Sequence, residues 1–140
     1  TANKTQLMIG LGMSSISDSW YGFAQNVKKV EEYTTIVQRG VIPVFRGHIL
    51  NEEDLVIRKH ILQIMCQFET SWEDPEMQFP ELEACLDRLS EMGQDGLVEI
   101  TEYGLRLPEH ARPYVRNVCM AFDLHLLRKK PQTRVFSMTI

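Results

Sequence analysis

The sequence predicts a mostly helical α+β protein with a small β-hairpin, in which a strand and glycine-loop segment precedes a winged-helix-like unit. Three observations predict this fold class. Apolar residues recur at helical spacing in several segments, two short alternating runs flank a turn, and glycines alternate with apolar residues near the start. We expect a leading segment over 1–47 and a helical, winged-helix-like domain over 48–140.

The composition is that of an ordinary globular protein. The 140 residues are 44% hydrophobic and 24% charged, which argues against a disordered or collagen-like chain. Fifteen basic and 19 acidic residues give a formal net charge of −4, which argues against a general binder of polyanions. No apolar run approaches the roughly 20 residues that span a bilayer, so we expect no membrane partner and a cytoplasmic location.

The leading segment is expected to begin with a short strand and a glycine loop. Leu7–Gly12 is apolar with glycines at alternate positions, which let a backbone pass close to a ligand or to another strand. Residues 20–26 are rich in aromatic side chains and are interpreted as a loop that ends in Asn26, a residue suited to cap a helix. Apolar residues at three- and four-residue steps then predict a helix over 27–40, with Gly40 as its stop.

The remaining residues are expected to form helices and one hairpin. Asn51, followed by three carboxylates, is a strong helix start, because an Asx side chain caps a helix and acidic residues suit its positive end. The order of expected elements is an extended segment over 43–50, a helix over 52–69, a loop over 71–78, a helix over 79–92, a hairpin over 97–107, a helix over 108–130 and a β-like tail over 134–140.

The cysteines and histidines do not have the spacing of a metal site. Cys66, Cys85 and Cys119 are separated by 19 and 34 residues, and the four histidines are scattered singly. Zinc and iron–sulfur sites usually take at least two ligands from one short loop. We therefore expect no metal ligand and no catalytic residue in this chain, and an odd cysteine count favours a reducing compartment.

A nucleic-acid-binding winged helix is one alternative that the element order leaves open. In that arrangement the helix over 79–92 would be the recognition helix, with the hairpin over 97–107 as the wing. That helix carries Glu81, Glu83, Asp87 and Glu91 against Arg88, a charge set that would repel phosphates. We therefore expect no nucleic-acid partner.

Three sequence segments, in a fixed order, resemble segments of a known family. They are Gly10–Ser17 followed by Phe23–Asn26, then Phe45–Gly47 before a helix with Arg58 and Lys59, and finally Arg116–Asp123. Together they resemble the C-terminal third of the oxygen-independent coproporphyrinogen III oxidases, which are radical S-adenosylmethionine enzymes of haem biosynthesis. A related family of haem chaperones, which would make the chain an interaction domain, is the second alternative.

The resemblance implies that the whole protein oxidatively decarboxylates two propionates of coproporphyrinogen III to the vinyl groups of protoporphyrinogen IX. That chemistry uses a [4Fe-4S] cluster and S-adenosylmethionine, with the cluster held by a CxxxCxxC loop that this chain lacks. We therefore expect a domain fragment that is inactive and binds neither cofactor alone. Its expected partners are the N-terminal radical barrel, the porphyrinogen and, for the isolated fragment, a second copy through an exposed apolar face.

The resemblance also implies a place for the cofactor. Ile16 matches a position that contacts S-adenosylmethionine in the family, and Gly10 and Gly12 beside it are expected to admit a nucleotide closely. On spacing alone, Ile16 would be a core isoleucine, and the two glycines would belong to an edge strand and turn.

Two arginines are the expected substrate ligands. Arg46 could pair bidentately with a propionate of the porphyrinogen, and Arg116 is the second expected substrate contact. The alternatives are a structural salt bridge for Arg46 and an ion pair with Asp123 for Arg116. The family often has an arginine where this chain has Met138, so the tail is not expected to bind a propionate here.

Overall fold

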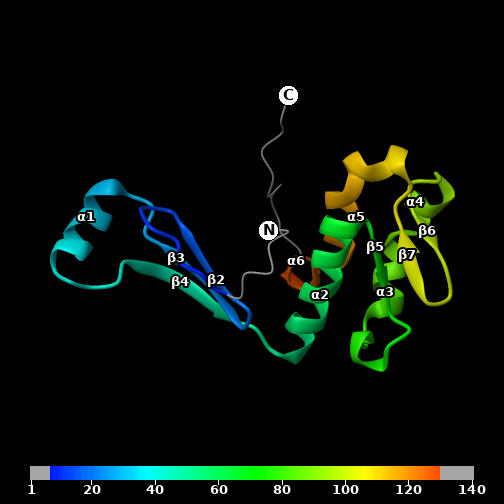
Figure 1. The fold of residues 1–140 in the computed structure, drawn as a ribbon, viewed down its shortest axis with the longest axis horizontal. Helices are drawn as coiled ribbons and strands as arrows, with labels where there is room; N and C mark the ends of the chain where they lie inside the picture. Colours follow the sequence, from blue (N-terminus) through cyan, green and yellow to red (C-terminus); the bar gives the residue numbers. More distant parts are fainter. Residues whose placement is uncertain (1–6, 130–140) are drawn as a thin grey trace. The chain divides into compact units, whose positions relative to one another are not determined.

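The computed structural model describes residues 7–129 and divides into two compact units, Thr1–Leu55 and Val56–Ile140 (Figure 1). Helices and antiparallel strands both contribute, so the predicted α+β class is confirmed. None of the helices among the described residues is long and apolar enough to cross a membrane. The β-like tail predicted over 134–140 lies outside the described residues.

The first unit is a four-stranded antiparallel sheet with one helix. Its strands lie in the order β1-β2-β3-β4, with α1 in the connection from β3 to β4. The elements are β1 (Leu7–Met8), β2 (Ile16–Ser19), β3 (Gly22–Asn26), α1 (Val30–Gln38) and β4 (Val44–Ile49).

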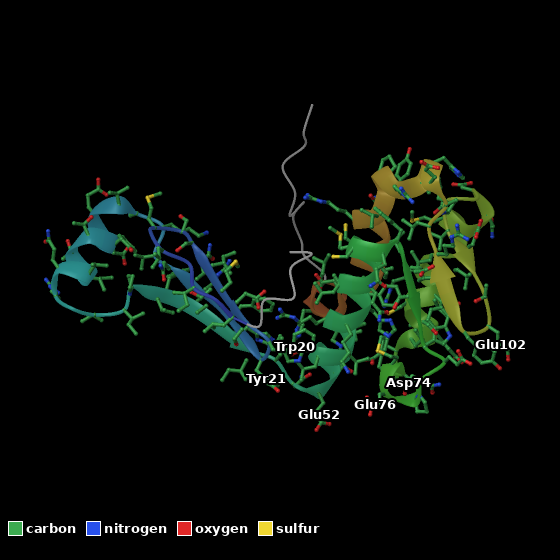
Figure 2. All side chains as sticks on the ribbon, viewed as in Figure 1. Trp20, Tyr21, Glu52, Asp74, Glu76 and Glu102 are labelled. Atoms are coloured by element: carbon green, nitrogen blue, oxygen red, sulfur yellow. The ribbon has the colours of Figure 1, made fainter. Side chains whose placement is uncertain are left out.

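The aromatic segment over 20–26, interpreted as a loop, is instead a turn and a strand. Trp20 and Tyr21 form a tight turn between β2 and β3 (Figure 2), and residues 22–26 pair with strands on both sides. The interpretation was wrong because aromatic side chains are enriched in strands as well as in exposed turns. The two turn residues, Trp20 and Tyr21, include no Asn, Asp or Gly, the residues by which a two-residue hairpin turn is recognised.

Asn26 was also wrongly assigned as a helix cap. It is the last residue of β3, and α1 begins at Val30 after the N-cap residue Lys29, which makes no side-chain capping bond. The side-chain amide of Asn26 instead binds backbone carbonyls of the glycine loop.

The second unit combines short helices with a three-stranded sheet in the order β5-β7-β6. The predicted helix from residue 52 and the predicted hairpin are confirmed, while the predicted loop over 71–78 contains the last residue of β5 and one short 3-10 turn. Its elements are α2 (Glu52–Gln67), β5 (Glu69–Ser71), η1 (Pro75–Met77), α3 (Leu82–Arg88), α4 (Ser90–Gln94), β6 (Glu99–Ile100), β7 (Gly104–Arg106), η2 (Glu109–Tyr114), α5 (Val115–Ala121) and α6 (Leu124–Lys129).

Short polar features mark the turns of this unit. The side chain of Asp74 accepts the backbone N–H of Glu76 and so caps η1. Glu102 lies at the tip of the hairpin that joins β6 to β7 (Figure 2), and Asp74, Glu76 and Glu102 are all exposed. These positions are consistent with turns that face solvent.

The two later helices predicted as continuous are interrupted. The helix over 79–92 begins only at Leu82 and divides at Leu89 into α3 and α4. The helix over 108–130 is three elements, because Pro113 lacks the N–H that an α-helix needs, and the first turn is 3-10. The Asp123 carboxylate accepts the Leu126 N–H at 2.9 Å and so caps the start of α6. This cap separates α6 from α5.

The hydrophobic core of the described residues lies in the second unit and surrounds a buried histidine. His60 has no exposed surface, and its ring stacks on Phe122 with centroids 5.5 Å apart. Its Nε2 lies 2.7 Å from the Met77 carbonyl oxygen, to which it must donate, and its Nδ1 lies 2.8 Å from the Thr70 hydroxyl. Burial lowers the pKa of His60 from its ordinary 6.5, so the ring is neutral in the folded chain near neutral pH.

The stability of the chain is therefore expected to depend on His60 in mild acid. Unfolded His60 takes up a proton below its ordinary pKa of about 6.5 while the folded ring stays neutral, so the unfolding free energy falls as pH is lowered, until the lowered folded pKa is reached. The slope from this group is at most about 1.4 kcal/mol per pH unit. Urea unfolding between pH 7.5 and 5 should show a steeper slope for the wild type than for His60→Gln, and equal slopes would contradict this.

The start of α2 offers a test of local stability. Asn51 Oδ1 accepts the Asp54 N–H at 2.8 Å, and Asp54 Oδ2 accepts the Asn51 N–H at 3.1 Å, which is a reciprocal capping box. We expect Asn51→Ala to lower the unfolding free energy by about 1 kcal/mol. Asn117→Ala, on the exposed surface of α5, is the control and should change it by less than about 0.5 kcal/mol; equal effects would exclude a capping role.

Candidate cofactor and substrate site

The loop between β1 and β2 is closed by one side-chain amide. The Nδ2 atom of Asn26 lies 3.2 Å from the Gly10 carbonyl oxygen, 2.9 Å from the Gly12 carbonyl oxygen and 3.0 Å from Ser15 Oγ. Asn26 is only 6% exposed, so these bonds lie within the unit. The loop is therefore a fixed structure with its carbonyl groups turned inward.

Further hydrogen bonds fasten the same loop to its neighbours. The Gly12 N–H donates to the Tyr33 hydroxyl on α1 at 3.1 Å, and the Ser14 N–H donates to the Val27 carbonyl at 2.8 Å. Ser14 itself has φ of 59°, a left-handed conformation uncommon for a residue with a side chain. These bonds hold the strained residue in place.

The two glycines of the predicted site have different physical roles. A Cβ on Gly10 would lie 2.7 Å from the backbone oxygen of Ile16, so Gly10 allows the loop to lie directly against β2. Gly12 has φ of +98° and no atom within 4 Å of its Cβ position, so it faces open space. Gly12 is therefore open on its Cβ side, and Gly10 allows close contact with the backbone of Ile16.

Ile16 and Arg46 lie on the same face of the sheet. Ile16 pairs with Gln25, and Gln25 pairs with Arg46, so the three residues form one row across β2, β3 and β4. Directly paired residues point to the same side of a sheet, and strands lie about 4.8 Å apart. The apolar candidate and the charged candidate are thus separated by about 10 Å, with Gln25 between them.

Both ends of this row are accessible. The Ile16 side chain is 50% exposed, which makes the core interpretation from spacing alone wrong. Arg46 is exposed, and its Nε donates to Gln25 Oε1 at 2.9 Å. Phe45 has no partner on β3, and this β-bulge lies immediately before Arg46.

Arg116 belongs to the other unit. It is exposed on α5, whereas Ile16, Gly10, Gly12 and Arg46 all lie in the first unit.

The hydrogen-bonding roles of Gln25 and Asn26 could not be predicted from the sequence alone. Both belong to a segment that carries the family resemblance, but spacing indicates no role for Gln25 and only the incorrect helix cap for Asn26. The available signal is two adjacent amide side chains in a strand whose neighbours are mostly apolar or small. The pairing of β3 with both neighbouring strands gives these amides their partners.

Two of the cysteines of the second unit, Cys85 and Cys119, are poor candidates for metal ligands. Cys85 and Cys119 are buried, and burial raises the pKa of Cys119 to about 11 and also raises the pKa of Cys85. Both are therefore protonated near neutral pH, whereas a metal or cluster binds the thiolate. Cys85 and Cys119 therefore do not fit as ligands of a [4Fe-4S] cluster.

Comparison with known proteins identifies relatives over nearly the whole chain. Oxygen-independent coproporphyrinogen III oxidases from Cereibacter sphaeroides and Salmonella typhimurium are each 34% identical, over 94% and 95% of this chain. The solved coproporphyrinogen III oxidase of Escherichia coli, described as a radical SAM enzyme, matches 90% of this chain with a TM-score of 0.76 and 27% identity. No family model matches the chain.

The fold of this chain thus matches a region of a solved enzyme of the radical SAM class. More particularly, the chain is a homologue of a region of the oxygen-independent coproporphyrinogen III oxidases, and the resemblance predicted from the sequence is confirmed. The chain spans about 30% of the length of these relatives.

The loop closure can be tested through the chemistry of Asn26. Its Nδ2 faces two carbonyl oxygens, so Asn26→Asp would place an acceptor-only carboxylate against them. We expect a loss of about 1–3 kcal/mol in unfolding free energy and faster hydrogen exchange at Gly12 and Ser14. Gln38→Glu, at the exposed end of α1, makes the same chemical change and should have neither effect; unchanged exchange in Asn26→Asp would contradict the closure.

Proposed function

We propose that the chain is the C-terminal region of an oxygen-independent coproporphyrinogen III oxidase and supplies part of its cofactor and substrate contacts. One observation carries this proposal: Ile16 and Arg46, the expected contacts for S-adenosylmethionine and a propionate, share one row on one accessible face. An apolar contact and a charged anchor about 10 Å apart suit a reaction between a nucleoside cofactor and a carboxylate side chain.

In this reaction each reacting propionate loses its carboxylate as CO2, and we propose that an arginine binds the substrate carboxylates before that loss. Each propionate, –CH2CH2COO⁻, becomes –CH=CH2 with release of CO2, one proton and two electrons. The cluster would be held outside this chain, and with S-adenosylmethionine it would supply the hydrogen abstraction. In this proposal Ile16 contacts the cofactor, Gly12 leaves room for it, and Arg46 and Arg116 each bind a carboxylate of the substrate.

The exposed apolar surface of the first unit supports a larger assembly. Among the described residues of this unit Val27 is the only buried hydrophobic side chain, so its apolar residues have almost no interior of their own. We propose that the rest of the oxidase covers this surface, and that a second copy covers it in the isolated chain. The exposed residues are Leu7, Met8, Ile9, Leu11, Met13, Ile16, Tyr21, Phe23, Val30, Val37, Val41, Ile42, Val44, Phe45 and Ile49.

The test uses the Cereibacter sphaeroides oxidase with this chain in place of the residues that it matches. We expect Ile16→Asp to raise the KM for S-adenosylmethionine at least about 10-fold, because it places an unpaired carboxylate in an apolar contact. Arg46→Ala should raise the KM for coproporphyrinogen III about 10- to 100-fold, because it removes charge-assisted hydrogen bonds. Both are measured by anaerobic turnover.

Two substitutions of the same chemistry serve as controls. Ile100→Asp alters an isoleucine of β6 that is 38% exposed and lies outside this apolar surface, and Arg39→Ala alters an exposed arginine after α1. Neither should change either KM by more than about twofold. If Ile16→Asp and Arg46→Ala behave like these controls, the proposed roles of the row are wrong.

A further inference from the structure

Gln25 connects the proposed substrate arginine to the glycine loop. Its Oε1 accepts the Arg46 Nε–H at 2.9 Å, and its Nε2 donates to the Ser14 carbonyl at 3.2 Å. We propose that Gln25 is a positioning residue that determines specificity, by holding the Arg46 guanidinium so that a carboxylate binds it end-on. This inference rests on the proposed role of Arg46.

The orientation of the Gln25 amide follows from the chemistry of its partners. Arginine has no acceptor, so the oxygen of the amide must face Arg46. A backbone carbonyl has no donor, so the nitrogen must face Ser14. An amide turned the other way would lose both bonds, and the side chain therefore has one stable orientation.

The bond to Gln25 restricts how Arg46 can bind a carboxylate. A guanidinium offers two bidentate edges to an anion, one formed by Nε and a terminal nitrogen, and one formed by the two terminal nitrogens. Because Gln25 occupies Nε, the side-on edge is blocked and the end-on edge stays available. The guanidinium keeps its positive charge, since its partner is a neutral amide.

The backbone around Arg46 supports the same geometry. The bulge at Phe45 interrupts the pairing just before Arg46, and bulges beside active sites often redirect a side chain. At the other end of the bridge, Ser14 is fastened by its own N–H to Val27. Gln25 thus ties the guanidinium to a backbone that is held in place, rather than to another mobile side chain.

The experiment uses the same Cereibacter sphaeroides oxidase carrying this chain. Gln25→Met has a similar shape and removes both hydrogen bonds, and it should raise the KM for coproporphyrinogen III about 3- to 10-fold with kcat within about twofold. Gln25→Glu keeps a partner for Arg46 but neutralises it and faces the Ser14 carbonyl with an acceptor, so its KM should rise at least about 10-fold. Gln38→Met is the matched control and should leave the KM unchanged.

The results separate this inference from the proposed function. A raised KM in Arg46→Ala together with wild-type KM in Gln25→Met would overturn the positioning role and leave the proposed role of Arg46 intact. If Arg46→Ala itself has wild-type KM, both fail. In the double variant Gln25→Met/Arg46→Ala, a KM equal to that of Arg46→Ala supports positioning, and additive effects overturn it.

A spectroscopic measurement on the 140-residue chain gives an answer without turnover. Slow exchange of the Arg46 Nε–H with solvent is expected in the wild type and in Gln25→Glu, and fast exchange in Gln25→Met. Sodium propionate should shift the terminal guanidinium resonances of Arg46 in the wild type more than in Gln25→Glu. Fast exchange in the wild type, or equal propionate shifts in the two proteins, would overturn the inference.

Discussion

The first unit depends on the side-chain amide of Asn26. Two carbonyl groups of the glycine loop accept hydrogen bonds from this one buried amide group, and without a donor both would lose these part-buried bonds. The bond fixes the loop against β2 and so sets where Ile16 emerges. The arrangement of the candidate site therefore starts from a hydrogen bond and not from hydrophobic packing.

This dependence is understandable from where the core lies. The buried apolar cluster of the described residues lies entirely in the second unit, with Phe122, Ile64 and Leu89 among its largest members. Among its described residues, the first unit has strand pairing, side-chain-to-backbone bonds and one buried valine instead of such a cluster. Polar bonds give directional control at little gain in stability, which suits a surface whose apolar side chains are exposed to meet another molecule.

Local patterns predicted the elements whose signals are local. The predicted start of α2 was correct because Asn51 and the acidic residues that follow it form a cap within four residues. The prediction of the hairpin in the second unit was correct because alternating apolar and polar residues and the turn residues lie in one short segment. By contrast, the last predicted helix is divided by Pro113, which lies in a 3-10 turn, and by Asp123, which caps a new helix. The apolar periodicity continues across both residues and therefore does not reveal the division.

The candidate site was predictable only through resemblance, and then only in part. Ile16, Gly12 and Arg46 were predicted from the sequence segments to which they belong. The row shared by Ile16 and Arg46 follows from the register of three strands, one of which was interpreted as a loop. Once β3 is misassigned, no argument from the sequence can bring Ile16 and Arg46 together. The structural purpose of Gly10 was likewise hidden, because it concerns a close approach to the backbone of Ile16.

The placement of two adjacent amides at the end of β3 explains how one strand can organise both the loop and the arginine. Successive side chains of a strand point to opposite faces, so Gln25 and Asn26 reach the loop from the two sides of the sheet. Asn26 donates to Gly10 and Gly12, and Gln25 donates to Ser14. A carboxylate at either position would repel these carbonyls, and at position 25 it would also cancel the charge of Arg46. A neutral amide that donates at one end and accepts at the other satisfies the loop and leaves the guanidinium cationic for a carboxylate.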